Sequence, residues 1–360
     1  MTSLGDFYRH GRIGVFFVLL FPLLSVLSFV YGIVLRLRVF LYDRRILPSL
    51  RPQNRLISIG NITLGGSGKT PLTEYVAGRL SSKVPVCILL RGYKRPGHRQ
   101  TGSDYPFLGD EGSLLKENLA DKDVRVKAGA DRAGQVLRME KEGFRGIFLL
   151  DDGFQHWRLK RDLDIVTCDA CAPFGNGRLL PAGQLREPKS HLKRADVFCL
   201  TRCDQADPQA VRDLEETLKA IQPSALIIKA IHEPQYLYDL KIRTRFSLDV
   251  LKAFPAGMIC GIARPEAFEK TLRGLGAEIR WKKCFEDHHA YTPDEIRAFC
   301  RQAAKKNIRV LITTQKDGQR LAGYTRHMDL GLDILVLKIA IKVIRGQEEL
   351  DARLRSVCGF

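Results

Sequence analysis

Residues 55–80 have the sequence RLISIGNITLGGSGKTPLTEYVAGRL, and this stretch decides the fold of the chain. Residues 55–60 (RLISIG), which are mostly apolar, predict a short buried strand, because a brief apolar run that ends at a glycine-rich turn is typical of a strand in a parallel sheet. Residues 71–80 predict a helix, since proline fits the first turn of a helix. Strand, glycine-rich loop and helix in this order are the context that a phosphate-binding loop requires.

The loop itself is Gly65-Gly66-Ser67-Gly68-Lys69-Thr70. Glycines let the backbone turn tightly so that its N–H groups point at phosphate oxygens, and the helix N-terminus adds a positive dipole. Lys69 would reach the β- and γ-phosphates of a nucleotide, and Thr70 would bind Mg²⁺. The common form of this motif has a glycine at the position that Thr63 holds here.

A second element of a nucleotide site follows further along the chain. Residues 146–150 (GIFLL) predict a buried strand that ends at Asp151-Asp152. An apolar strand that ends in a carboxylate delivers a ligand, or a group that orders water, to Mg²⁺. We therefore expect Asp151 and Asp152 to be metal ligands beside the phosphate loop.

Short apolar runs alternate with helical segments along the chain. Further strands are predicted at residues 84–90, 124–127, 164–169 and 196–201, with a helix at 131–142 and a polar loop at 91–112. This alternation predicts a parallel α/β sheet. After residue 230 the pattern restarts, with strands at 257–261, 278–282 and 309–313 and helices at 265–275 and 293–306.

The fold class that follows is α/β, with a phosphate-loop parallel-sheet domain, a second, smaller α/β domain and an N-terminal membrane-associated helix. The predicted boundaries are 1–50 for the helix and its basic flank, 51–230 for the phosphate-loop domain, 231–345 for the smaller domain and 346–360 for a C-terminal segment. The alternating residues 333–343 would pair with residues 226–238 and link the two domains.

Composition agrees with a multidomain globular protein. The chain has 360 residues, of which 45% are hydrophobic and 27% charged, so wholesale disorder is excluded. Its 58 Lys and Arg against 40 Asp and Glu give a net charge of +18. Such an excess favours an acidic partner, such as a nucleotide phosphate, an anionic lipid, a phosphorylated substrate or a nucleic acid.

Nine cysteines are too few for a disulfide scaffold, and their odd number favours a reducing environment. The pairs Cys168/Cys171 and Cys199/Cys203 have spacings that a zinc site could use. Cys168 and Cys199 lie in apolar, strand-like runs, however, and free cysteine is often a small core residue. We therefore expect buried free thiols in these strands.

The N-terminus has the composition of a membrane segment. Residues 13–35 contain no charged residue, and as a helix they would span about 35 Å. A cleaved signal peptide is disfavoured by this length and by the lack of a small-residue cleavage site. More arginines follow the run than precede it, so the following domain should face the cytoplasm. Pro22 and Gly32 could break the helix, so a helix that lies in one leaflet is an alternative to a spanning one, and a buried core helix is a third possibility.

Several longer motifs resemble one family, the tetraacyldisaccharide 4′-kinases (lipid A 4′-kinases). GNITLGGSGKTP (residues 60–71) is similar to the family's phosphate loop, in which the first glycine is also absent. DDGFQH (151–156) resembles its DDGxQH motif, and FEDHHAY (285–291) its FxDHHxY element. GNGRLLPAG (175–183) and LREP (185–188) match a further signature, with Gln184 where proline is usual. The resemblance covers nearly the whole chain.

The resemblance implies an ATP-dependent kinase that phosphorylates the 4′-hydroxyl of a tetraacylated glucosamine disaccharide 1-phosphate and so yields lipid IVA. It implies ATP and Mg²⁺ as cofactors and a location on the cytoplasmic face of the inner membrane, with neither nucleic acid nor an obligate protein as partner. An anionic lipid substrate agrees with the positive net charge. The ATP-binding residues would be Thr63, Leu64, Gly65, Gly66, Ser67, Gly68, Lys69 and Thr70.

A sugar hydroxyl is a poor nucleophile, so a positioned carboxylate is expected as its base. Gly109-Asp110-Glu111 resembles the family's GDE element, which implies Asp110 as this base. His288, from the second domain, would be its partner, and His289 could exchange roles with it. Candidates for gripping the phosphates or the sugar are Glu111, Arg132, Gln155, Arg186 and Glu187.

Two other classes of protein stay open on the sequence alone. Thr201-Arg202-Cys203-Asp204 follows a predicted strand and resembles the base-reading motif of GTPases, with arginine in place of lysine. A membrane-associated regulatory GTPase is therefore the first alternative. A basic nucleic-acid-binding protein ranks last, because the lysines and arginines are dispersed and form no known reading module.

Overall fold

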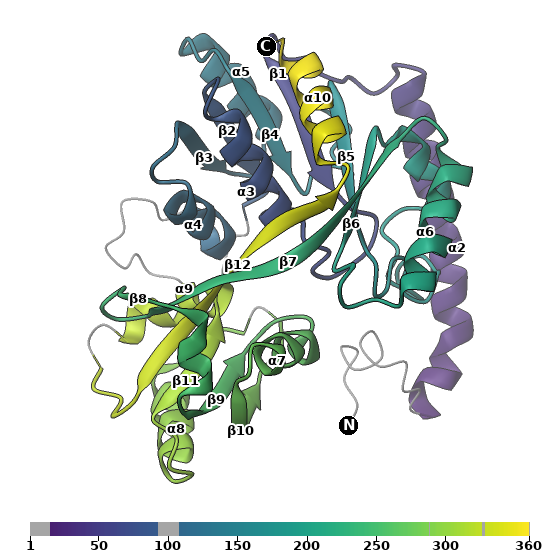
Figure 1. The fold of residues 1–360 in the computed structure, drawn as a ribbon. Coiled ribbons are helices and arrows are strands. Elements are labelled where there is room, and N and C mark those ends of the chain that lie inside the picture. The colour runs from purple at the N-terminus through teal and green to yellow at the C-terminus, as the bar shows by residue number, and fades with distance from the viewer. Residues whose placement is uncertain (1–14, 93–107, 288, 326–327, 360) are drawn as a thin grey trace. The chain divides into compact units, whose positions relative to one another are not determined.

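A computed structural model describes residues 15–92, 108–287, 289–325 and 328–359. The chain divides into two compact units. The first comprises the described residues of Met1–Tyr93, Leu119–Ile231 and Ile341–Phe360, and the second those of Lys94–Asn118 and His232–Ala340. Two strands, β7 (Leu226–Asp239) and β12 (Asp333–Arg345), run from one unit into the other, and the strand order places them side by side as predicted (Figure 1).

The first unit contains a parallel sheet in the order β6-β5-β1-β4-β2-β3. Its strands are β1 (Arg55–Gly60), β2 (Val86–Leu90), β3 (Val124–Ala128), β4 (Ile147–Asp151), β5 (Leu163–Asp169) and β6 (Val197–Thr201). The four central strands are buried along most of their length, as a sheet covered on both faces requires; they are β5, β1, β4 and β2. Its helices are α3 (Lys69–Leu80), α5 (Arg132–Lys141), α6 (Pro208–Ile221) and α10 (Gln347–Cys358), and a 3-10 turn, η1, covers Lys189–Arg194.

Alternation along the strands explains how the helices cover this sheet. Val136 and Met139 of α5 pack in one cluster with Leu56, Leu89 and Leu150 of the central strands. The intervening strand residues, which include Ile57, Ile88 and Leu149, are equally buried. Their side chains point to the opposite face, because successive residues of a strand alternate. Helix α3 contacts the same strands, and this places the phosphate loop at the carboxyl end of β1.

The second unit has its own parallel strands, in the order β10-β9-β11-β12. They are β9 (Pro255–Cys260), β10 (Glu278–Cys284) and β11 (Val310–Thr314), with β8 (Arg245–Phe246) antiparallel to β7. Helix α7 (Pro265–Gly274) packs on one face of β9, β11 and β12, and α8 (Pro293–Ala304) and α9 (Gln315–Thr325) pack on the other. Helix α4 (Gly109–Asn118) and the 3-10 turn η2 (Leu248–Lys252) complete the unit.

The units differ from the predicted division in two places. Residues 341–360 group with the first unit, where Arg79 of α3 forms an ion pair with Asp351 of α10. The segment with Asp110, which the sequence placed in the phosphate-loop domain, groups with the second unit. The reason is tertiary packing, because α4 contacts α9 and its acidic side chains pair with basic residues there.

The N-terminal helix α2 extends over Val15–Asp43. It runs without interruption through Pro22 and Gly32, the two residues that could have broken it. Residues Leu20–Asp43 are long and apolar enough to cross a membrane, with a mean hydropathy of 2.0, and only 17% of the most apolar window is buried. This exposure argues against a buried core helix.

Candidate phosphate site

The phosphate loop lies between β1 and α3, as predicted. Gly65 and Gly68 have φ values of +98° and +85°, a conformation that favours glycine over other residues. A Cβ atom built on Gly65 or Gly66 would meet nothing within 4 Å, so the surface of the loop is open there. The open backbone and the start of α3 at Lys69 together form a site suited to an anion.

Buried hydroxyl groups from two neighbouring strands support the loop from behind. The Ser67 hydroxyl lies 2.8 Å from that of Thr167 in β5, and the Thr201 hydroxyl in β6 donates to the Ser67 carbonyl at 3.0 Å. Arg202 also donates to the Gly66 carbonyl at 2.6 Å and is held by Asp169 at the end of β5. The sequence marked Arg202 only as part of a base-reading motif. In the structure its guanidinium is nearly buried and fixes the shape of the loop.

Asp151 is the last residue of β4, and its register partner in the adjacent strand β1 is Ile59. Its side chain is buried and accepts hydrogen bonds from Thr70 at 3.4 Å and from Thr73 at 3.0 Å. The structure therefore brings Thr70 and Asp151 together, as the sequence led us to expect. Thr73 was missed, although its position three residues after Thr70 puts both on one helical face.

Asp152 has a left-handed backbone with φ of 51° and points at two cations. Its Oδ1 lies 3.7 Å from the Lys69 ammonium, and Arg186 Nη1 donates to Oδ1 at 2.7 Å and to Oδ2 at 2.9 Å. Burial alone would raise the pKa of Asp152, but the charges of Lys69 and Arg186 and the hydrogen bonds from Arg186 lower it below its usual value. Asp152 is therefore held ionised beside the lysine of the phosphate loop.

Two more of the predicted residues fix the backbone around this carboxylate pair. Arg132 is buried and donates from Nη1 to the carbonyl of Asp151 at 2.8 Å and to that of Asp152 at 3.4 Å. Gln155 donates to the carbonyl of Asn61, just before the phosphate loop, at 2.8 Å. Both side chains therefore contact the protein's own backbone and shape the site from within.

Glu187 follows Arg186 but serves a separate group of residues. Its buried carboxylate accepts from His191 at 2.7 Å and from Arg194 at 3.0 Å. Burial alone would raise the pKa of Glu187, but these two partners lower it. Arg194 also donates to the carbonyl of Phe154 at 2.9 Å, so this cluster secures the segment that follows Asp151-Asp152.

The second unit contains the predicted base, and the structure gives it a partner that the sequence did not reveal. Arg320 of α9 donates from Nε to Asp110 Oδ2 at 2.7 Å. Its Nη1 donates to the Gly261 carbonyl at 3.0 Å and to Asp317 at 3.1 Å, and Asp317 also accepts from Tyr291. The Arg320 side chain is only 2% exposed, so a rigid, buried guanidinium orients the Asp110 carboxylate.

The other predicted residues of this unit have different partners. Glu111 pairs with Lys316 at 2.6 Å. The His289 ring stacks on Phe285, and its Nε2 lies 3.2 Å from the carboxylate of Glu295, which caps α8. His288, the proposed partner of Asp110, lies outside the described residues.

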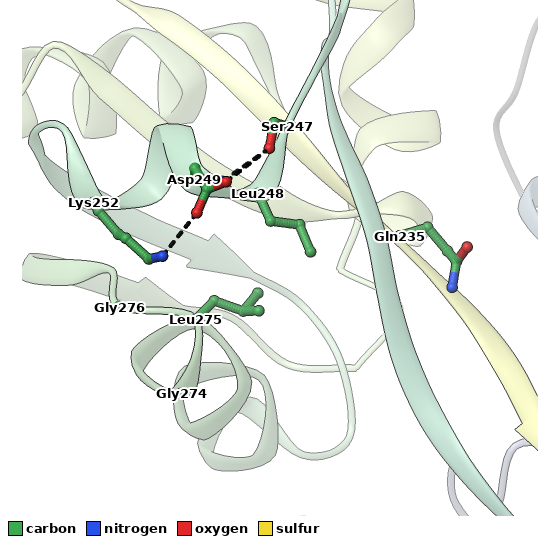
Figure 2. Close-up of a pocket in the computed structure, with 8 residues that line it drawn as sticks. All are labelled: Gln235, Ser247, Leu248, Asp249, Lys252, Gly274, Leu275 and Gly276. Carbon is green, nitrogen blue, oxygen red and sulfur yellow. Dashed lines mark hydrogen bonds and ion pairs between the residues drawn. The ribbon is translucent and has the colours of Figure 1, made fainter. Parts of the chain in front are cut away.

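A cavity of about 570 Å³ opens on the second unit (Figure 2). It is lined by Leu248 and Leu275, two glycines and an Asp249–Lys252 ion pair that also involves Ser247. None of the residues singled out in the sequence lines it.

Five of the nine cysteines are buried core residues, whereas Cys171 and Cys284 are exposed. Cys168 and Cys199 are buried, and burial raises the pKa of the Cys168 thiol to about 12. Among the described residues no three His, Cys, Asp or Glu side chains are grouped in a way that could hold a metal ion. The expectation of buried free thiols at Cys168 and Cys199 is confirmed.

The fold and the site together define a phosphate-loop α/β protein that has two carboxylates at the end of a strand beside its loop. The family model described as tetraacyldisaccharide-1-P 4′-kinase matches residues 20–359. The chain belongs to this family.

Individual relatives agree with this assignment. Tetraacyldisaccharide 4′-kinase of Anaeromyxobacter dehalogenans is 38% identical, with 88% of this chain and 85% of the relative covered. That of Halothermothrix orenii is 34% identical, with 89% and 88% covered. A crystal structure of LpxK from Aquifex aeolicus in complex with ATP matches with a TM-score of 0.70 and 28% identity, covering 95% of this chain and 99% of that one. These names are those of kinases, so the GTPase alternative is not favoured.

Proposed function

We propose that this chain is a lipid A 4′-kinase, which transfers the γ-phosphoryl group of ATP to the 4′-hydroxyl of a tetraacylated disaccharide 1-phosphate. The observation that carries the proposal is the placement of Lys69 and Thr70 beside Asp151 and Asp152 in a chain of this family. The ATP complex of the Aquifex aeolicus relative supports ATP as the phosphoryl donor. An anionic lipid also suits a chain with a net charge of +18.

The donors present suit Mg²⁺, which takes oxygen ligands and usually keeps several waters beside one or two carboxylates. Thr70 and Asp151 supply a hydroxyl and a carboxylate within 3.4 Å of each other, and no nitrogen or sulfur donor is needed. These two residues would hold the ion, with Asp152 adjacent. When bound, Mg²⁺ neutralises charge on the transferred phosphoryl group.

The remaining residues of the first unit position charge. Lys69 reaches forward from the start of α3 and would contact the β- and γ-phosphates. Arg186 and Lys69 keep Asp152 ionised, and Arg132 fixes the backbone on which both carboxylates stand. Such preorganised charges need no rearrangement during phosphoryl transfer. Electrostatic stabilisation of the transition state by groups already in place is usually the largest single contribution to catalysis.

Asp110 is the proposed general base, which would take the proton of the 4′-hydroxyl. Its support is its place in the GDE element and its fixed orientation on Arg320. A carboxylate with one oxygen bound to a buried guanidinium keeps its other oxygen in a defined direction, and general bases must be placed within hydrogen-bond distance of the proton that they remove. We propose Arg320 as the residue that positions this base.

We further propose that the protein acts on the cytoplasmic face of the inner membrane, with α2 lying along one leaflet. The helix contacts its own unit from Phe21, below the Arg178 guanidinium, to Tyr42, stacked on Trp157, a length of about 30 Å. Its opposite face is exposed and apolar along the whole length, with Leu23, Val26, Leu27, Val30, Ile33, Val34 and Leu37 at helical spacing. A helix attached lengthwise to a polar domain cannot span a bilayer without carrying that domain's charges into hydrocarbon.

The central test is transfer of labelled phosphate from ATP to the purified tetraacyldisaccharide 1-phosphate in detergent micelles. We expect stoichiometric label on the lipid with wild type and none with Lys69→Ala. GTP should compete poorly with ATP in the same assay. A folded wild-type protein that binds ATP but leaves this lipid unlabelled would refute the proposed substrate.

The leaflet proposal has its own test. Val30→Glu places a charge on the exposed face of α2. It leaves intact the contacts that α2 makes through Phe21, Ser28, Tyr31 and Tyr42, so it should release a folded protein into the soluble fraction. Leu137→Glu, at an exposed apolar position of α5, adds the same charge elsewhere on the first unit and is the matched control, which should leave membrane binding unchanged. If the Val30→Glu protein sediments with membranes as the wild type does, the exposed face is not the membrane-binding surface.

A further inference from the structure

Two polar side chains of α2 form hydrogen bonds to the rest of the first unit. The Ser28 hydroxyl donates to the carbonyl of Leu179 at 2.9 Å and accepts from the amide of Ala182 at 2.8 Å. One turn later, the Tyr31 hydroxyl donates to the carbonyl of Arg186 at 3.0 Å. Ser28 is only 8% exposed, so these bonds are largely shielded from water and both of its hydrogen-bonding functions are used.

The segment that these groups hold, residues 178–186, has almost no regular secondary structure, and most of its backbone groups need partners from outside a sheet or helix. On its other side the segment is bonded to the approach of the phosphate loop. The amide of Leu64 donates to the Gln184 carbonyl at 2.8 Å, and the amide of Arg186 donates to the Ile62 carbonyl at 2.7 Å. The segment therefore lies between α2 and the phosphate loop and is bonded to both.

The side chain of Arg186 connects this segment to the charged centre of the site. Its guanidinium binds both oxygens of Asp152, which in turn lies 3.7 Å from Lys69. The Tyr31 bond is made to the carbonyl of Arg186 itself. Loss of the bonds from α2 would leave the backbone of Arg186 held from one side only, and the ion pair with Asp152 would lose its fixed geometry.

We propose that Ser28 and Tyr31 are positioning residues for phosphoryl transfer: they hold residues 178–186 so that Arg186 stays on Asp152. The membrane helix then has a second task besides attachment, because the same helix that contacts lipid on one face completes the phosphate site with the other. This inference rests on the proposed function for its kinetic consequence, but its structural part concerns hydrogen bonds that exist without substrate.

The test uses full-length protein with Ser28→Ala, Tyr31→Phe and the double variant. Ser28→Thr keeps the hydroxyl and serves as the rescue. Ser25→Ala is the matched control, since the Ser25 hydroxyl donates to the Phe21 carbonyl within its own helix. Kinetic constants are measured in detergent micelles, where attachment to a bilayer plays no part. Co-sedimentation with phosphatidylethanolamine–phosphatidylglycerol vesicles reports membrane binding separately.

We expect the double variant to lower kcat about tenfold, because each lost hydrogen bond weakens the positioning by an amount typical of one such bond. KM for ATP should change less than about threefold and vesicle binding not at all, since the exposed face is intact. Ser28→Thr should restore most of kcat, and Ser25→Ala should match wild type. A double variant with wild-type kcat, or an equal loss in Ser25→Ala, would overturn the proposal.

Amide hydrogen exchange without substrate gives a second, independent measurement. The amides of residues 182–186 should exchange faster in Tyr31→Phe and in the double variant than in wild type, while those of α5 should not change. Unchanged exchange at residues 182–186 would also overturn the proposal. Because this measurement needs no lipid, it separates a failure of the positioning role from a failure of the proposed substrate.

Discussion

Replacement of Arg186 by methionine removes the cation that hydrogen-bonds to Asp152 and keeps a side chain of similar length. Arg186 Nη1 lies 2.7 and 2.9 Å from the two Asp152 oxygens, and both side chains are about four-fifths buried. A hydrogen bond between charged groups contributes about 1.5–3 kcal/mol, or roughly 10- to 150-fold in rate. Lys69 remains 3.7 Å from Asp152, so we expect the lower part of this range, a kcat about 10- to 30-fold below wild type.

The same substitution should change the pH dependence. In wild type the pKa of Asp152 is lowered, because the charges of Lys69 and Arg186 outweigh the opposing effect of burial. Its ionised form therefore stabilises the folded state above the ordinary aspartate pKa of about 3.9, and this stabilisation is lost as the pH falls through the lower folded pKa. Without Arg186 the opposing effect of burial is less compensated, so the pKa of Asp152 rises and activity should fall at a higher pH than in wild type.

The assay is kcat and kcat/KM from pH 3 to 9 for wild type, Arg186→Met and Arg186→Lys, with urea unfolding at each pH, so that the scan extends below the ordinary aspartate pKa of about 3.9. Arg186→Lys keeps the charge but loses the planar fork, so it should fall between the other two. Circular dichroism checks that all three proteins are folded. An acid limb at the same pH in wild type and Arg186→Met, or a kcat within twofold of wild type, would refute the role assigned to this ion pair.

Three further predictions concern single side chains of the two units. Lys69→Ala should abolish turnover, because Lys69 would contact the phosphates of ATP. The variant should stay folded with only a small fall in urea midpoint, because Asp152 keeps its bonds to Arg186. Kinase activity of the folded variant would contradict the phosphate-loop assignment. Thr73→Val removes the hydroxyl 3.0 Å from Asp151 and should lower kcat about tenfold. Thr73→Ser keeps the hydroxyl and, as the control, should stay close to wild type. Equal kcat values for the two variants would exclude a role for this bond. Asp110→Ala should lower kcat 10²- to 10⁴-fold with ATP binding unchanged, as loss of a general base does, and adding His288→Ala should cost little more if the two act as one unit. Multiplicative losses in that double variant would show that Asp110 and His288 act independently.

Local features of the sequence were sufficient to predict the structure at the centre of the first unit. The strand, loop and helix of residues 55–80 form where predicted, because a glycine-rich turn between an apolar run and a helix start has few other solutions. The carboxylates at the end of β4 lie beside this loop for the same reason, since neighbouring parallel strands present their carboxyl ends at one edge. Prediction of Thr70 next to Asp151 needed no knowledge of distant contacts.

Helices outside this pattern were harder to predict from the sequence. Helix α4 begins within the loop predicted at residues 91–112, and its glycine and acidic residues give little apolar periodicity. Its place is decided by Arg320 and Lys316, which no local pattern marks as partners. Helix α2 likewise continues through Pro22 and Gly32, and contacts with the rest of the first unit stabilise it between Phe21 and Tyr42.

The sequence by itself determined the family, the phosphate loop and the apolar N-terminal run, since each depends on residues that are adjacent in the chain. Only the tertiary structure decided which side chains hold these residues in place. Arg320 reaches Asp110 across 210 positions of sequence, and Ser28 reaches Leu179 across 151. Both residues of each pair belong to the same unit, and they meet only when the core of that unit packs, so no periodicity or spacing could reveal them.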